Sequence, residues 1–90
     1  MFRIWGKIWT ENHLIKDIVI ACDDTSLNRT RKVYYCLDEI CYAFDLGKPI
    51  WLEQNKKEFI LHSKVRFYSD SFMEEIDFDY LELQVIEEDY

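Results

Sequence analysis

The chain has 90 residues, of which 49% are hydrophobic and 17% aromatic, and a formal net charge of −7. This length fits one domain, and so many aromatic residues argue against intrinsic disorder. The longest uninterrupted apolar run, residues 18–22, is far below the roughly 20 residues of a membrane span, and charges interrupt residues 1–7 where a signal peptide needs an apolar block. We therefore expect a cytoplasmic protein with a single domain over residues 1–90.

Residues 2–10 alternate in the period of a β-strand. One face carries the core candidates Phe2, Ile4 and Ile8. The other face interleaves basic and aromatic side chains: Arg3, Trp5, Lys7 and Trp9. Residues 14–22 are rich in β-branched side chains and predict a second strand. The polar residues 11–13 between them predict a hairpin loop of about three residues, in which Asn12 can take a left-handed conformation.

A helix is predicted between Asp24 and Trp51. Its apolar side chains recur at helical spacing and form a core-facing stripe: Val33, Cys36, Leu37, Ile40, Cys41 and Phe44. Residues 23–26 offer four consecutive candidate N-caps. Gly47 can adopt the left-handed conformation that follows a helix, and Pro49 cannot continue one. We expect the sheet to pack against this stripe.

The C-terminal half predicts shorter elements. Asn55 can cap a second helix over residues 56–64, with Phe59 and Ile60 facing inward, whereas residues 50–52 fit either a strand or a helix entry. Capping-box spacing at residues 71–74 predicts one helical turn. Residues 77–86 predict a last strand, and residues 87–90 a frayed tail. This order favours an α+β fold, a mainly antiparallel sheet of the N-terminal hairpin and the C-terminal strand packed on one main helix.

Two sets of aromatic side chains are candidates for partner binding. Trp5 and Trp9 alternate with basic residues, a pattern that some single-strand nucleic-acid binders use, but a net charge of −7 opposes the approach of phosphate. A second layer, a dimer mate or a protein partner are the alternatives. Tyr35 and Tyr42 lie with Arg31 opposite the core stripe of the helix, where they form either a contact patch or an ordinary exposed surface.

The excess acidic charge lies near the C-terminus. Residues 74–90 hold eight acidic and no basic side chains, whereas residues 1–73 hold ten acidic and eleven basic ones. The candidate acidic binding segment comprises Asp77, Asp79, Glu82, Glu87 and Glu88. A metal site is disfavoured because strand alternation sends Asp77 and Glu82 to opposite faces. The segment could dock a basic partner, mimic nucleic acid, or pair with the basic residues 56, 57, 64 and 66 of the same chain.

No catalytic constellation stands out. The only glycines are Gly6 and Gly47, which excludes a glycine-rich phosphate loop, and His13 and His62 are the only imidazoles. Three cysteines form no disulfide framework and fit buried thiols. We expect neither a cofactor nor a metal, and no enzymatic activity.

Two stretches, residues 45–52 (DLGKPIWL) and 76–82 (IDFDYLE), resemble those of a family of small bacterial proteins that has no assigned activity. The resemblance implies a bacterial cytosolic setting and no particular chemistry. We therefore expect a non-enzymatic protein–protein interaction or regulatory module, with homodimerisation as one form of that binding. An acidic inhibitor that mimics nucleic acid is the alternative, and a small-ligand binder or small enzyme is a third hypothesis.

Overall fold

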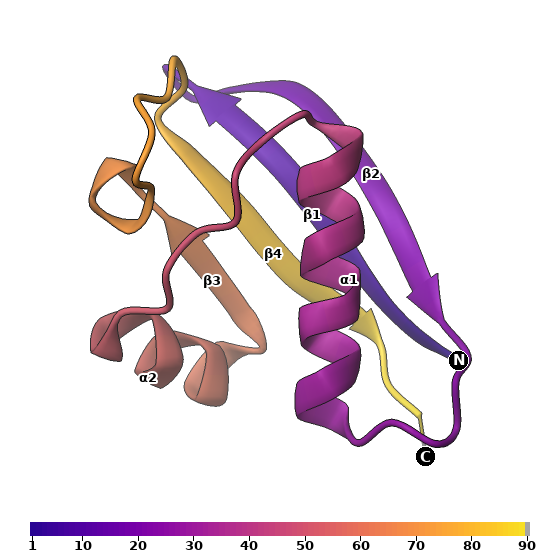
Figure 1. Cartoon of the computed structure of the whole chain (residues 1–90). Coiled ribbons are helices and arrows are strands. Elements are labelled where there is room, and N and C mark those ends of the chain that lie inside the picture. Colours follow the sequence, from indigo (N-terminus) through magenta and orange to yellow (C-terminus); the bar gives the residue numbers. More distant parts are fainter. Residues whose placement is uncertain (90) are drawn as a thin grey trace.

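The computed structural model describes residues 1–89, which form an antiparallel sheet and two helices (Figure 1). The strands are β1 (Phe2–Thr10), β2 (His13–Cys22), β3 (Lys64–Phe67) and β4 (Tyr80–Glu87), in the order β2-β1-β4-β3. The predicted α+β class, the N-terminal hairpin and the C-terminal strand are confirmed. Strand β3 was not predicted, because its four residues are too few to show a period. Lys64, expected at the end of the second helix, is its first residue.

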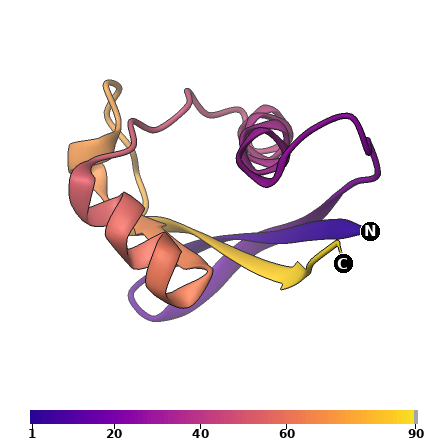
Figure 2. The ribbon, with the colours of Figure 1, turned by 90° about the horizontal axis from the view of Figure 1, so that it is seen from below.

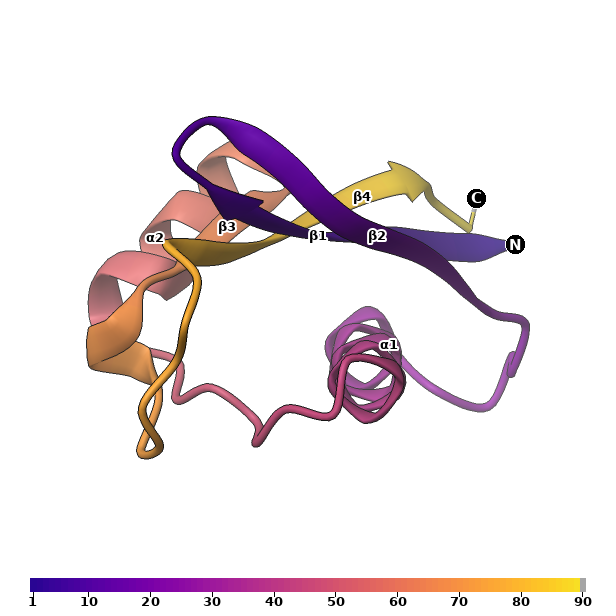
Figure 3. The ribbon, with the colours of Figure 1, turned by 90° about the horizontal axis from the view of Figure 1, so that it is seen from above.

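One helix covers one face of this sheet. Helix α1 (Arg29–Ala43) crosses the sheet over β1 and β2, whereas α2 (Glu53–His62) packs on β3 at the edge (Figures 2 and 3). The predicted stripe of α1 is buried from Val33 to Cys41 against apolar side chains of the strands, among them Phe2, Ile4, Leu81 and Leu83. Its last member, Phe44, is the C-cap of the helix and is only half-buried. Among the described residues, no helix is long and apolar enough to cross a membrane.

Gly6 sets how closely α1 approaches the sheet. A Cβ atom at this position would lie only 2.7 Å from Cγ2 of Ile40 and 2.9 Å from its Cδ1. Atoms this close would overlap, so any larger residue would push the helix away from β1. The single break in the apolar alternation of β1 is thus the point where the helix rests on the strand.

The caps of α1 differ from those predicted. Asn28 is the N-cap, and its Oδ1 accepts a hydrogen bond of 2.9 Å from the backbone N–H of Arg31. Asp24, one of the predicted caps, instead accepts hydrogen bonds from Ser26. At the other end, Asp45 rather than Gly47 takes the left-handed conformation, with φ of 56°. The N–H groups of residues 45 and 46 then donate to the carbonyls of Tyr42 and Cys41, a Schellman arrangement.

Helix α2 begins three residues earlier than predicted, after Leu52. Asn55 is not the cap but lies in the first turn, where its Oδ1 accepts from the N–H of Leu52 at 3.0 Å. Its Nδ2 also donates to the carbonyl of Arg66 at 3.1 Å, so this buried amide joins α2 to β3. Phe59 faces inward as predicted, whereas the prediction for Ile60 is wrong, since 80% of that residue is exposed.

The connections and the tail also differ from expectation. The hairpin turn has two residues, Glu11 and Asn12, both with positive φ, because His13 already pairs with Thr10. Residues 50–52 form neither a strand nor a helix, and the short helical turn lies at Ser69–Ser71 rather than at 71–74. The tail prediction is wrong for residue 87, which belongs to β4. For residue 90 it lies outside the described residues.

Candidate functional site

The face of the sheet opposite α1 carries no helix in the described part of the chain (Figures 2 and 3). Strand register and alternation place one set of side chains on it. We call this set the open sheet face: Arg3, Trp5, Lys7, Trp9, Leu14, Asp17, Val19, Ala21, Lys64, Arg66, Tyr80, Glu82, Gln84 and Glu87. The face therefore combines the tryptophans of β1 with residues from three other strands.

Glu82 is the centre of a hydrogen-bonded network on this face. Its Oε1 lies 3.0 Å from Nζ of Lys7 and 3.3 Å from Nε1 of Trp9, and its Oε2 accepts from Nε of Arg66 at 3.0 Å. Lys7 also donates to Oε1 of Gln84 at 2.8 Å. Glu82 and Lys7 are only 3% and 5% exposed. The neighbouring side chains therefore shield this ion pair from solvent, although no helix of residues 1–89 packs on this face of the sheet.

Burial alone would raise the pKa of the Glu82 carboxyl. Hydrogen bonds from Arg66 and Lys7 outweigh that cost, and its pKa lies below the ordinary glutamate value. Glu82 is therefore ionised at neutral pH, and it holds both cations in place.

The aromatic rings of the open sheet face are fixed by these polar groups. Nε1 of Trp5 donates to Asp17 at 2.8 Å, and the ammonium of Lys7 lies 3.9 Å from the centroid of the Trp5 ring. On the other side, the rings of Trp9 and Tyr80 stack with centroids 6.4 Å apart, and the guanidinium of Arg66 lies 4.8 Å from the Tyr80 centroid. The rings are oriented before any partner arrives, which lowers the entropy cost of binding.

The structure separates the predicted partner-binding residues into two surfaces. Trp5 and Trp9 lie on one face of the sheet, as their alternation predicted, and both are half-buried there. Arg31, Tyr35 and Tyr42 are exposed on the outer side of α1, which points away from the sheet. Tyr42 is 86% exposed. The two sets cannot form one contact surface, because the sheet and the helix lie between them.

The acidic segment is similarly divided. Glu87 pairs with Arg3 at 2.6 Å, Glu88 with Arg29 at 3.0 Å, and Glu82 with the two cations of the open sheet face. Asp79 accepts from the backbone N–H of Glu11 at 2.8 Å. Asp77 is exposed and lines a hollow on the α1 side of the sheet. The basic partners of the segment are thus mostly in the N-terminal half, and only Arg66 comes from the expected basic stretch.

Further residues of the site were absent from the sequence prediction. Arg66 entered it only as a member of the basic stretch, and Tyr80 and Gln84 were expected on the face of the last strand that carries Glu82 but were not proposed as binding residues. The alternation of β4 does carry a signal, since Tyr80, Glu82 and Gln84 occupy every second position. These side chains lie next to the tryptophans because β4 pairs with β1. Sequence periodicity does not predict which strands pair.

Residues 1–89 contain neither a candidate metal site nor a reactive thiol. These residues hold no group of three or more His, Cys, Asp or Glu side chains that could bind a metal ion. The three thiols are free and buried, and burial raises the pKa values of Cys36 and Cys41 to about 12. Thiols in this state are poor nucleophiles at neutral pH.

Comparison with known proteins returned no match, whether against family models, curated proteins or solved structures. The resemblance to the small bacterial family remains a prediction.

Proposed function

We propose that the protein binds another protein through the open sheet face. The observation that carries this proposal is the fixed aromatic and cationic surface around Glu82 on a sheet that α1 covers on only one side. Trp, Tyr and Arg side chains are the residues most enriched at the energetic centres of protein interfaces. Lys7 and Arg66 are already paired with Glu82, so the cations and the carboxylate together leave one positive charge for a partner to accommodate.

The charge of the face supports a protein partner over nucleic acid. The open sheet face holds four basic and three acidic side chains, one positive charge in excess, whereas the whole chain carries −7. Phosphate binding draws its affinity from unpaired Lys and Arg side chains. Glu82 and Glu87 pair with three of the four cations of this face. A partner surface with apolar side chains and few charges fits this balance better.

The acidic-mimic alternative receives less support. A mimic of nucleic acid needs exposed, unpaired carboxylates along one surface. Glu82, Glu87 and Glu88 each pair with a cation of the same chain. Only residues 74–79 of the acidic segment present carboxylates without an ion pair among residues 1–89.

The first test is the mass of the protein in solution. Sedimentation equilibrium over a range of concentrations would report whether the mass rises from 11.0 kDa toward twice that value. Such a rise, lost in Trp9→Ala and Val19→Glu, identifies the partner as a second copy. Val19 is 45% exposed, so its replacement introduces a charge without opening the core. Tyr42→Ala on the opposite surface is the matched control and should leave the mass unchanged.

If the mass stays at 11.0 kDa at all concentrations, the protein does not self-associate and the partner must be a different protein. Affinity capture would then compare wild-type bait with the Val19→Glu and Tyr42→Ala baits, in nuclease-treated lysate at low and high salt. A protein retained by wild type and Tyr42→Ala but lost by Val19→Glu supports the proposal. Equal capture by all three baits contradicts it. Quenching of tryptophan fluorescence by a single-stranded oligonucleotide would also contradict it, and would reassign the face to nucleic acid.

A further inference from the structure

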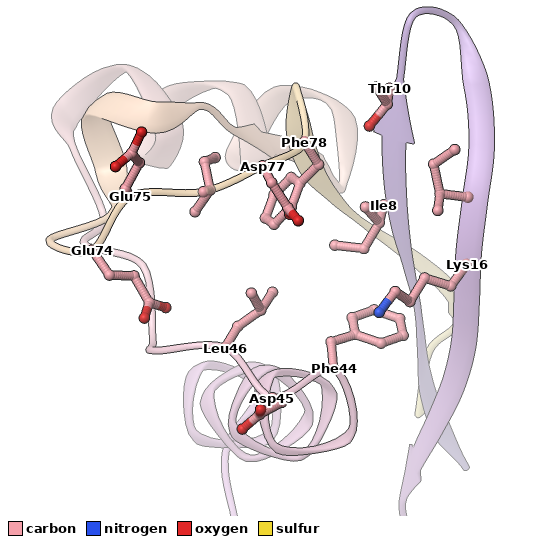
Figure 4. Close-up of a pocket in the computed structure, with 12 residues that line it drawn as sticks. Ile8, Thr10, Lys16, Phe44, Asp45, Leu46, Glu74, Glu75, Asp77 and Phe78 are labelled. Atoms are coloured by element: carbon pink, nitrogen blue, oxygen red, sulfur yellow. The ribbon is translucent and has the colours of Figure 1, made fainter.

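A hollow of about 810 Å³ opens on the α1 side of the sheet, away from the open sheet face (Figure 4). Three parts of the chain enclose it: the end of α1 with residues 44–46, the turn end of the hairpin, and the segment 74–78. Its volume lies within the roughly 300–1,000 Å³ of small-molecule sites. The Schellman turn at Asp45 and the hydrogen bond of 2.6 Å from Gly47 N–H to Glu74 Oε1 hold two of these walls together.

The floor of the hollow is apolar. Phe44, Leu46 and Phe78 are half-buried and line it, together with the buried Ile8 of β1 (Figure 4). A ligand with an apolar body would remove this surface from water, which is favourable in proportion to the area covered.

The rim of the hollow is acidic. Four carboxylates line it, from Asp45, Glu74, Glu75 and Asp77, against the single amine of Lys16. Figure 4 shows the carboxylates of Glu74 and Asp77 on the side of the hollow, whereas those of Asp45 and Glu75 turn away from it. None of the four forms an ion pair with a basic side chain of residues 1–89. The hollow therefore has an uncompensated negative charge.

The Lys16 side chain indicates which chemistry suits this environment. Its ammonium lies 5.9 Å from the centroid of the Phe44 ring. A cation within this distance of an aromatic face is attracted by the ring quadrupole. An alkylammonium of the protein itself thus already lies beside the aromatic ring at the hairpin side of the hollow (Figure 4).

We propose that this hollow binds a small amphipathic organic cation, an ammonium group carried on an aromatic or short aliphatic body. The body would lie on Phe44, Leu46 and Phe78, and the ammonium would donate to Glu74 and Asp77. This proposal does not depend on the function proposed for the open sheet face, because Trp5, Trp9 and Glu82 lie on the other side of the sheet.

The test uses three probes with the same body and different charge: 4-phenylbutylammonium, 4-phenylbutanol and 4-phenylbutyrate. Binding is followed by ¹H–¹⁵N NMR of the full chain. The ammonium should shift amides of residues 44–46 and 74–78 and bind about tenfold more tightly than the alcohol, because charge-assisted hydrogen bonds are stronger than neutral ones. The butyrate should bind most weakly.

Variants place the binding in the hollow. Asp77→Asn should weaken binding of the ammonium probe several-fold and leave binding of the alcohol unaffected. Lys16→Met should strengthen binding of the ammonium probe, because it removes a competing cation. Glu39→Gln, an exposed acid on the outer side of α1, is the matched control. Equal affinity for ammonium and alcohol, or an unchanged affinity in Asp77→Asn, would overturn the proposal. No shift of the hollow's amides at millimolar probe would do the same. If the peptide acetyl-Leu-Lys-Leu-amide binds more tightly than 4-phenylbutylammonium, the proposal is overturned and the ligand of the hollow is a peptide.

Discussion

The network around Glu82 makes a strong prediction about stability. Glu82→Gln removes a charge that is 3% exposed and leaves the ammonium of Lys7, 5% exposed, with amide oxygens but no carboxylate beside it. Removing one partner of a buried ion pair costs about 3–5 kcal/mol, because the other charge stays desolvated. Gln keeps the shape of Glu and an acceptor oxygen, so we expect the lower end, about 3 kcal/mol. In a domain of this size that corresponds to a fall in melting temperature of roughly 12–24 °C.

The same strand provides a matched control. Glu87 pairs with Arg3 at 2.6 Å, but both side chains are more than 40% exposed, so Glu87→Gln should cost less than about 1 kcal/mol. Urea denaturation followed by circular dichroism would measure both free energies of unfolding. A double variant Lys7→Met/Glu82→Leu should recover much of the loss, since apolar replacement of both partners is often neutral. If Glu82→Gln and Glu87→Gln prove equally mild, Lys7 and Glu82 are hydrated in solution and the open sheet face is not fixed as described.

Three further predictions concern the fold itself. Gly6→Ala should lower the free energy of unfolding by about 1–3 kcal/mol, because the new Cβ would lie 2.7 Å from Ile40 Cγ2; a double-mutant cycle with Ile40→Ala should show that the two changes are coupled. Asn28→Ala should cost about 1 kcal/mol by removing the cap of α1, whereas Thr25→Ala should cost almost nothing; equal effects would contradict the cap assignment. Glu82 is more acidic in the folded protein, so its contribution to stability is complete above the unfolded glutamate pKa of about 4.3 and is lost as pH falls through the lower folded value. Urea titrations between pH 2 and pH 6 should show this loss in wild type and a smaller one in Glu82→Gln.

The elements with a strong period were predicted correctly, because side-chain burial alone determines them. The stripe of α1 faces the sheet from Val33 to Cys41, and β1 buries Phe2, Ile4 and Ile8. In each case one face of a regular element is apolar and the other polar, so any fold that buries the apolar face gives the same local structure.

Features set by local hydrogen bonds or by tertiary contacts were not predictable in the same way. Residues 23–26 and Asn28 all have N-cap chemistry, and the choice falls on the residue whose Oδ1 reaches the N–H of Arg31. Asp45 takes the left-handed position two residues before the available glycine. Ile60 has the spacing of an inward residue but is exposed, because α2 packs at the edge of the sheet and buries only a narrow face.

The candidate site shows the same division. Alternation placed Trp5 and Trp9 together on one face, as predicted. Their surroundings depend on strand order, since β4 lies beside β1 and brings Tyr80 and Glu82 onto them, although more than 70 residues separate Trp9 from Glu82 in the chain. No period in a sequence encodes a contact over that separation.

The fold also determines which acidic side chains near the C-terminus are paired and which remain unpaired. Half of the eight acidic side chains in residues 74–90 are neutralised by cations that the fold brings to them: Glu82, Glu87, Glu88 and Asp89, the last paired with Lys32. The other half stays without an ion pair among the described residues, and three of those four, Glu74, Glu75 and Asp77, line the hollow beside Phe44. The uneven charge of the sequence therefore becomes a nearly neutral sheet face and an acidic hollow on the opposite side. For this reason the two surfaces should select different ligands, and removing charge from one of them should leave binding at the other unchanged.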